Sequence, residues 1–191
     1  QYLAPEMVAR LARDTAALRL GGERRTISVL FCDVRGFTAL AERLKDDPER
    51  LTSLVGRLLD PLSEAILAHG GTIDKYIGDC VMAFWNAPLD DPDHAAHAVA
   101  AALAMLEAVE RLNRELAAEA GADGPAPRFA VGVGVNTGSC VVGNMGSRTR
   151  FDYTAIGDAV NLASRLEGAT KDHGVPCLVG EETARAAAGA F

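Results

Sequence analysis

The stretch GTIDKYIGDCVMAFW, residues 71–85, joins the signals of a β-hairpin to two polar side chains that a hairpin does not need. Residues 72–77 are rich in strand-forming side chains, Gly78 supplies a turn, and residues 81–85 continue as an apolar strand. Asp79 stands at the tip of this hairpin, and Lys75 lies a short way before it. A carboxylate ahead of an apolar strand is costly to hold near a core unless it faces a cation. We therefore expect functional roles for both residues.

The composition indicates one globular domain with a short appendage, since 49% of the 191 residues are hydrophobic and 24% are charged. The net charge of -7 argues against non-specific binding of nucleic acid, which needs clustered Lys and Arg. It does not exclude a nucleotide, because metal ions and a few local cations can hold one polyphosphate. The cysteines are scattered and lack metal-binding spacing, which is typical of reduced thiols in a cytoplasmic protein: Cys32, Cys80, Cys140 and Cys177.

Residues 1–22 are predicted to form a helical connector that ends at Gly21-Gly22, followed by one folded domain over residues 23–191. No apolar run reaches membrane-spanning length and no signal segment opens the chain, so we expect a soluble, cytoplasmic piece. The sequence begins without Met and stops at Phe191 with no closing strand. We therefore expect a longer protein that carries a membrane or sensor domain.

The next patterns predict a buried strand and two helical segments. The run from Thr26 to Cys32 is typical of a strand buried on both faces, ended by Asp33 and followed by a helix that Thr38 or a neighbour could cap. Residues 48–69 have helical periodicity, but Pro61 interrupts it. An interior proline costs about 3 kcal/mol in an unbroken helix. We therefore expect a kink there, or a second helix capped by Asp60.

The second half of the chain predicts a long helix over residues 93–120, with these residues facing the core: Val99, Leu103, Leu106, Val109, Leu112 and Leu116. Residues 129–135 alternate large side chains with Ala130, Gly132 and Gly134, so one side of this strand should lie against a close partner. Further predictions are a turn at 137–139, a strand at 140–143, a helix at 155–171 and a strand at 175–179. This order indicates an α+β fold, ferredoxin-like or palm-like, with helices packed on a mixed, mainly antiparallel sheet.

This topology brings two carboxylates together. A right-handed crossover makes the first strand parallel to the first strand of the hairpin, so Asp33 and Asp79 should meet at one edge of the sheet. Two adjacent carboxylates repel unless a divalent ion lies between them, and oxygen ligands without His or Cys suit Mg²⁺ or Mn²⁺. The alternative is that Asp33 caps the following helix and Asp79 only occupies a turn.

Two further segments could hold a nucleotide. Gly36, Phe37 and Thr38 lead into a helix amino terminus, whose free N–H groups favour phosphate oxygens. Asn161 and Arg165 are four positions apart in a predicted helix and share a face, where Arg can bind phosphate and Asn a sugar oxygen. The alternative for this second pair is an ordinary solvated surface.

Four stretches resemble the catalytic domain of class III nucleotidyl cyclases in order and spacing: VLFCDVRGFT, DKYIGDCVMAFWNAP, VGVGVNTGSCVVGNMGS and YTAIGDAVNLASRLE. The resemblance covers about residues 25–179. It implies two metal ions per active site, Mg²⁺ or Mn²⁺, held by Asp33, Val34 and Asp79. It also implies a head-to-tail homodimer with two shared sites.

By the same resemblance, the partner chain would complete each site with the residues that bind the substrate. Lys75 and Thr154 would contact the purine, Asn161 would orient the ribose, and Arg165 would stabilise the transition state. Lys75 suits adenine because a lysine can donate to the N1 acceptor of that base. Many adenylyl members carry Asp where this chain has Thr154, and the Thr variant resembles a subgroup that includes bicarbonate-responsive cyclases.

The resemblance predicts an adenylyl cyclase that converts ATP to 3',5'-cyclic AMP and pyrophosphate as the output domain of a signalling protein. One departure is that a phosphate-binding lysine from a later strand is absent. The alternatives are a non-catalytic nucleotide-sensing or dimerising module of the same fold, a guanylyl cyclase, and a cyclic-dinucleotide synthase. The last is disfavoured because residues 77–80 read Ile-Gly-Asp-Cys instead of the Gly-Gly-acidic-Glu-Phe turn of that family.

Overall fold

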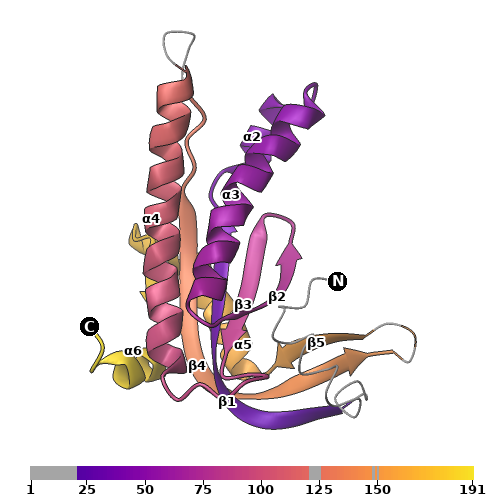
Figure 1. Cartoon of the computed structure of the whole chain (residues 1–191), viewed down its shortest axis with the longest axis vertical. Coiled ribbons are helices and arrows are strands. Elements are labelled where there is room, and N and C mark those ends of the chain that lie inside the picture. The colour runs from indigo at the N-terminus through magenta and orange to yellow at the C-terminus, as the bar shows by residue number, and fades with distance from the viewer. Residues whose placement is uncertain (1–20, 121–125, 148, 150) are drawn as a thin grey trace.

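The computed structural model describes residues 21–120, 126–147, 149 and 151–191 (Figure 1). Its elements in chain order are β1 (Gly21–Val34), α2 (Phe37–Arg43), α3 (Pro48–Ala68), β2 (Thr72–Ile77), β3 (Cys80–Trp85), α4 (His94–Ala120), β4 (Val131–Gly146), β5 (Phe151–Ile156), α5 (Asp158–His173), β6 (Cys177–Val179) and α6 (Glu181–Ala187). The predicted connector helix falls on residues outside the described part. Gly21 and Gly22 begin β1, so these two glycines belong to a strand.

The strands form one sheet in the order β2-β3-β1-β4-β5, and β6 adds to β4. Every pairing is antiparallel except the parallel pair β4–β6. This confirms the predicted α+β fold with a mainly antiparallel sheet, and β1 lies beside the hairpin as the crossover topology requires. Figure 1 shows that β1 and β4 are long and bend, so that their lower parts and β5 extend away from the β2–β3 hairpin.

From Ile27 to Cys32, β1 is buried on both faces, as the run TISVLFC predicts, whereas its first residues are mostly exposed. Leu30, Cys32 and Val34 join a core formed with α3 and α4. The alternate residues join a second core with α5: Ile27, Val29 and Phe31. The sheet is therefore covered by α3 and α4 on one face and by α5 on the other.

Of the predictions around α2 and α3, the cap at Thr38 itself and the second helix from Asp60 are wrong, while the kink at Pro61 stays a prediction. The residue that caps α2 is Gly36, whose backbone φ of 74° lies in the left-handed region, and Thr38 lies inside the helix. The helix α3 runs unbroken through Pro61 and is capped by Asp47, so no second helix begins at Asp60. Leu58 and Leu62, which flank the proline, are 2% and 1% exposed. Their burial offsets the cost of the interior proline.

The core-facing side of α4 differs from the prediction in its first half. Leu103 is 45% exposed, and the buried positions there are Ala95, Ala98, Ala101, Ala102 and Met105. The predicted Val109, Leu112 and Leu116 are buried. Small side chains let this half of α4 approach its neighbours closely. No helix in the described ranges is both long and apolar enough to cross a membrane, α4 included.

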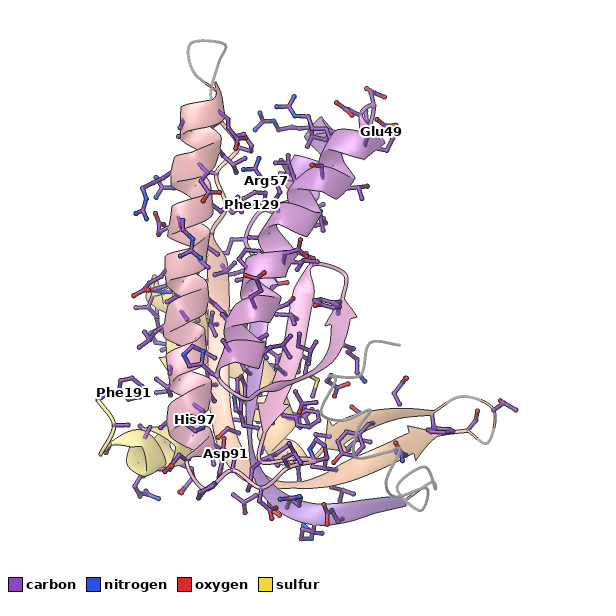
Figure 2. All side chains as sticks on the ribbon, in the orientation of Figure 1. Glu49, Arg57, Asp91, His97, Phe129 and Phe191 are labelled. Atoms are coloured by element: carbon purple, nitrogen blue, oxygen red, sulfur yellow. The ribbon has the colours of Figure 1, made fainter. Side chains whose placement is uncertain are left out.

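Polar contacts at the surface connect the ends of α4 to the rest of the chain (Figure 2). Arg57 of α3 donates two hydrogen bonds of 2.7 Å to Glu119. At the other end, His97 donates to Asp91 over 2.8 Å. Both contacts lie at the surface, where water screens them, so they add little to stability. The long helix is held mainly by its buried face.

β4 is one continuous strand, so the predicted turn at residues 137–139 is wrong. Thr137 and Gly138 pair with Ser28 and Ile27 of β1. A side chain on Gly138 would lie 2.8 Å from Ala159, so this glycine permits a close approach of α5 and does not form a turn.

The predicted helix at 155–171 begins later than expected. Residues 151–156 form β5, which pairs with the end of β4, and α5 starts after Gly157. The prediction that a close partner covers the stripped face of β4 is confirmed. A Cβ atom on Gly134 would lie 2.2 Å from the Glu167 nitrogen of α5.

Candidate functional site

Asp33 and Asp79 are brought together by the pairing of β1 with β3. Cys32 pairs with Val81, so the next residue, Asp33, lies beside the β2–β3 turn that carries Asp79. Partial burial raises the pKa of Asp33, and the negative charge of Asp79 raises it further. Lys171 and the backbone N–H of Val34 act in the opposite direction. The two carboxylates therefore lie in one partly buried region, where β1 ends and β3 begins.

A third carboxylate, Glu167 of α5, interacts electrostatically with the Asp33–Asp79 pair. Burial is the main cause that raises the pKa of Glu167, and the negative charge of Asp33 raises it further. Its Oε1 atom is buried and has no hydrogen-bond partner within the described ranges. It fits there because Gly132 has no side chain, since a Cβ atom on that glycine would lie 2.8 Å from Oε1. The sequence pointed to this residue in two indirect ways, through the glycine pattern of β4 and as the last residue of the stretch YTAIGDAVNLASRLE.

The donor set suits a hard divalent cation. Cys80 follows Asp79 directly, and burial raises the pKa of its thiol to about 12, which favours the neutral thiol in the metal-free chain. In the described part of the chain, no three His, Cys, Asp or Glu side chains cluster so as to hold a metal. Mg²⁺ is commonly bound in this manner, by one or two carboxylates together with water and substrate phosphates. The carboxylate pair therefore fits the predicted metal.

Val34 and the segment Gly36–Thr38 follow Asp33 directly. The side chain of Val34 is aliphatic and buried, so only its backbone carbonyl could serve as a metal ligand. The amino end of α2 has no side-chain cap and no acidic residue in its first turn. Its backbone N–H groups therefore face no competing carboxylate from this turn.

Lys75 and Thr154 are in direct contact. The Nζ atom of Lys75 donates to the Oγ1 atom of Thr154 over 3.2 Å. A residue that the sequence did not single out, Asp74, holds both of them. Its Oδ2 atom accepts a hydrogen bond of 2.5 Å from the Thr154 hydroxyl, and its Oδ1 atom lies 3.1 Å from Lys75 Nζ.

This cluster joins strands at opposite ends of the strand order. β2 is at one edge of the sheet and β5 at the other, but the bending of β1 and β4 brings them into contact. A register shift between Ile73 and Lys75 marks a β-bulge at Asp74. Neighbouring residues of a regular strand point to opposite faces, and the bulge accounts for Asp74 and Lys75 both reaching Thr154.

Asn161 and Arg165 lie on the exposed side of α5. Each is two positions before a residue that faces the sheet, namely Ala163 and Glu167, and such positions point to nearly opposite sides of a helix. The pair shares a face, as predicted. The structure does not bring it toward Asp33 and Asp79 within one chain.

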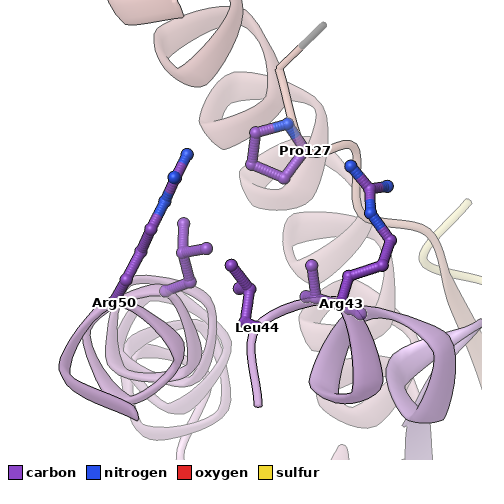
Figure 3. A pocket seen from close by; sticks show the side chains of 6 residues that line it. Arg43, Leu44, Arg50 and Pro127 are labelled. Carbon is purple, nitrogen blue, oxygen red and sulfur yellow. The ribbon is translucent and has the colours of Figure 1, made fainter. Parts of the chain in front are cut away.

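A pocket of about 240 Å³ lies apart from these residues (Figure 3). Arg43, Leu44 and Arg50 stand around it, with Pro127 opposite, and Leu40 and Leu54 complete its lining. None of the predicted site residues lines this pocket.

Residues 22–187 match the family described as adenylate and guanylate cyclase catalytic domain. The chain is 41% identical over 155 residues to adenylate cyclase 1 of Rhizobium meliloti (strain 1021). These residues make up 81% of this chain and 22% of that protein. It is 40% identical over 161 residues to an adenylate cyclase of Anabaena cylindrica, with coverage of 84% and 30%. The chain thus spans less than a third of the length of these two relatives.

Solved structures show the same likeness. The adenylyl cyclase CyaB from P. aeruginosa superimposes with a TM-score of 0.79 at 40% identity, covering 89% of this chain and 84% of that one. The guanylyl cyclase Cya2 superimposes with a TM-score of 0.77 at 34% identity, covering 88% and 81%. The family match extends from β1 to α6 and includes every predicted site residue. The chain therefore belongs to the class III nucleotidyl cyclases.

Proposed function

We propose that this chain is the catalytic domain of an adenylyl cyclase that converts ATP to 3',5'-cyclic AMP and pyrophosphate. The observation that carries the proposal is the 3.2 Å contact between Lys75 and Thr154. A lysine donates to the N1 acceptor of adenine, whereas guanine presents an N1–H donor at that position. Because the chain is similar both to an adenylyl and to a guanylyl cyclase, the choice of base rests on these side chains.

In the proposed reaction the ribose 3'-oxygen attacks the α-phosphorus in line. The bond from that phosphorus to the β-phosphate oxygen breaks, pyrophosphate leaves, and the hydroxyl proton passes to water. Asp33 and Asp79, with the carbonyl of Val34, would hold two Mg²⁺ or Mn²⁺ ions, which lower the pKa of the hydroxyl and neutralise phosphate charge when bound. Asn161 would orient the ribose.

Charge develops on the phosphoryl oxygens as the new bond forms. Arg165 would offset it with its fixed N–H donors, and the backbone N–H groups of Gly36, Phe37 and Thr38 would bind the phosphates. Arg165 is exposed and makes no ion pair with another described residue. It is therefore available to a substrate.

We propose that two chains build each site in a head-to-tail homodimer. Within one chain Asn161 and Arg165 point away from the carboxylate pair, so a second chain has to supply them. Large apolar side chains lie exposed near both halves of the site, which is typical of an interface: Ile77 at 54%, Ile156 at 59% and Leu162 at 37%. The domain would act in the cytoplasm as part of a longer signalling protein.

The decisive experiment incubates the purified chain with ATP or GTP and Mg²⁺ or Mn²⁺, and identifies the product by mass spectrometry. We expect 3',5'-cyclic AMP from ATP and a much lower yield from GTP. Asp79→Ala is the matched control, because it removes a carboxylate of the metal site and should abolish the product. Equal use of GTP would refute the role given to Lys75. A chain that binds ATP and forms no cyclic product under any condition would indicate a nucleotide-sensing module.

A further inference from the structure

We propose that Asp74 is a positioning residue that fixes the hydrogen-bond polarity of Thr154, and that this polarity makes the site prefer adenine to guanine. The inference rests on the proposed function, since it assumes that Lys75 and Thr154 face the purine. It assigns a role to a residue that would not itself touch the nucleotide.

The position of Asp74 is unusual for a carboxylate. Its side chain is 0% exposed, while that of the adjacent Lys75 is 41% exposed. Burial raises the pKa of Asp74, and the hydrogen bond from Thr154 and the charge of Lys75 act in the opposite direction. Its Oδ1 atom pairs with the Lys75 charge without a well-directed hydrogen bond. A buried carboxylate is tolerated only when such partners compensate it.

The two partners of Thr154 fix the direction of the hydrogen bonds that its hydroxyl makes. A hydroxyl has a single proton to donate, and an ionised carboxylate can only accept. The proton of Thr154 therefore goes to Asp74 over 2.5 Å. The ammonium group of Lys75 can only donate, and it uses one lone pair of the same oxygen. What Thr154 can still offer to a ligand is an acceptor.

The Thr154 acceptor and the Lys75 donor together match the hydrogen-bonding pattern of adenine and not that of guanine. Adenine presents an acceptor at N1 and a donor at its exocyclic amino group, so Lys75 and Thr154 can each pair with it. Guanine presents a donor at N1 and an acceptor at O6. With the Thr154 proton held by Asp74, the hydroxyl cannot donate to O6. A site built for one hydrogen-bond pattern discriminates strongly, because the wrong base leaves polar groups unpaired.

The alternative is that Asp74 only stabilises the bulge in β2. The two roles differ in what they change. A structural residue alters the stability of the chain and affects both nucleotides alike. A residue that fixes the polarity of Thr154 alters the ratio between them, and does so only while Thr154 has its hydroxyl.

The test uses Asp74→Asn, which keeps the shape of the side chain and can donate its amide to Thr154, so that the hydroxyl proton is released. The dissociation constants of 3'-deoxy-ATP and 3'-deoxy-GTP, which lack the attacking hydroxyl, are measured with Mg²⁺ by calorimetry. We expect the preference for the adenine nucleotide to fall by about tenfold, the effect of one hydrogen bond. The ratio of kcat/KM for ATP and GTP should fall in parallel. Asp172→Asn, the same change at an exposed position of α5, is the control and should leave both ratios unchanged.

A double-mutant cycle completes the experiment. Thr154→Val removes the hydroxyl, and we expect Asp74→Asn to have no further effect on the binding ratio in that background. Asp74→Ser, a smaller neutral side chain, replaces Asp74→Asn if the latter does not fold. An unchanged ratio in a folded Asp74 variant would overturn the inference, as would an equal effect with and without the Thr154 hydroxyl. Failure of the proposed function would show differently, as a wild-type chain that binds the nucleotides and forms no cyclic product.

Discussion

At the scale of single residues, Asp33 shows how a functional charge costs stability. Its pKa is raised in the folded chain, chiefly by burial and then by Asp79. At a pH well below the ordinary pKa of an aspartate, about 3.9, Asp33 is protonated in both the folded and the unfolded chain. It then has no effect on the free energy of unfolding. As the pH rises, the unfolded chain ionises first, so the free energy of unfolding falls until the folded chain has ionised too. At pH 7 the metal-free chain therefore carries the full penalty.

We therefore predict that Asp33→Asn stabilises the metal-free chain at pH 7 while it abolishes cyclase activity. The amide carbonyl can still accept from the Val34 N–H, but the repulsion by Asp79 disappears. The gain should be about 1 kcal/mol or less, because the site is only partly buried. It should shrink as the pH falls toward the raised pKa of Asp33. The midpoint of thermal unfolding, measured with a chelator at several pH values, checks this.

The same variant separates the metal from the fold. Millimolar Mg²⁺ should raise the unfolding midpoint of the wild-type chain, because a ligand that binds only the folded state stabilises it. It should have a much smaller effect on Asp33→Asn. Asp172→Asn serves as the control and should behave like the wild type in both respects. A chelator-treated Asp33→Asn chain that is less stable than the wild type at pH 7 would show that the carboxylate has a structural role.

At the scale of elements, the glycines of β4 determine how closely α5 packs on the sheet. Gly134 faces the α5 backbone directly, since its Cβ atom would lie 2.2 Å from the Glu167 nitrogen and 2.3 Å from the Ala163 carbonyl oxygen. Backbone atoms cannot move aside as a flexible side chain can. Any side chain here has to push α5 away from β4, and with it Glu167, which interacts electrostatically with Asp33.

Gly134→Ala should therefore destabilise the chain by at least about 2 kcal/mol, the usual size of an overpacking effect. Gly168→Ala is the matched control in α5 itself, where a Cβ atom would meet nothing within 4 Å. It should stabilise the chain by about 0.5–1 kcal/mol, because alanine favours a helix interior over glycine. Urea unfolding followed by circular dichroism measures both. Similar effects of the two substitutions would mean that α5 is not held tightly against β4.

The elements that sequence reasoning predicted well are those with one dominant pattern. The run from Ile27 to Cys32, the β2–β3 hairpin and the stripped face of β4 each match the structure. Errors arose where one residue type serves two purposes. Gly138 permits the approach of α5 where a turn was expected, and the alanines of α4 are buried where leucines were expected to face the core. Only tertiary packing separates such cases.

At the scale of the whole molecule, the site depends on distant segments. The pairing of Asp33 with Asp79 could be predicted because it follows from the strand order. The contact of Asp74 with Thr154 could not, because it joins the two edge strands through the bending of β1 and β4 and depends on a bulge in β2. The roles that the resemblance implies for Asn161 and Arg165 stay predictions, since both residues face away from the carboxylates in a single chain.

The separation of Asn161 from the carboxylates within one chain leads to a test of the proposed homodimer. Asp33→Ala should remove the metal site of its own chain, and Asn161→Ala the ribose contact that its chain gives to the other. Each variant alone should have at least about a hundredfold lower activity, because neither homodimer has a complete site. In a mixture, about half of the dimers should contain both variants if the chains exchange freely, and each of these has one intact site. Activity should then recover to about a quarter of the wild-type value, since half of the dimers have one of two sites.

The mixing experiment needs two controls. Affinity tags of two kinds, one on each variant, allow the mixed dimer to be purified and its content of both chains verified by mass spectrometry. Asp33→Ala mixed with Asp79→Ala should not recover, because both substitutions damage the same half of the site and every pairing leaves each site without a metal ligand. Recovery with Asn161→Ala and not with Asp79→Ala is the result that a site built from two chains requires. A verified mixed dimer of Asp33→Ala and Asn161→Ala that stays inactive would mean that the carboxylates and Asn161 act within one chain, and the proposed arrangement would have to be abandoned.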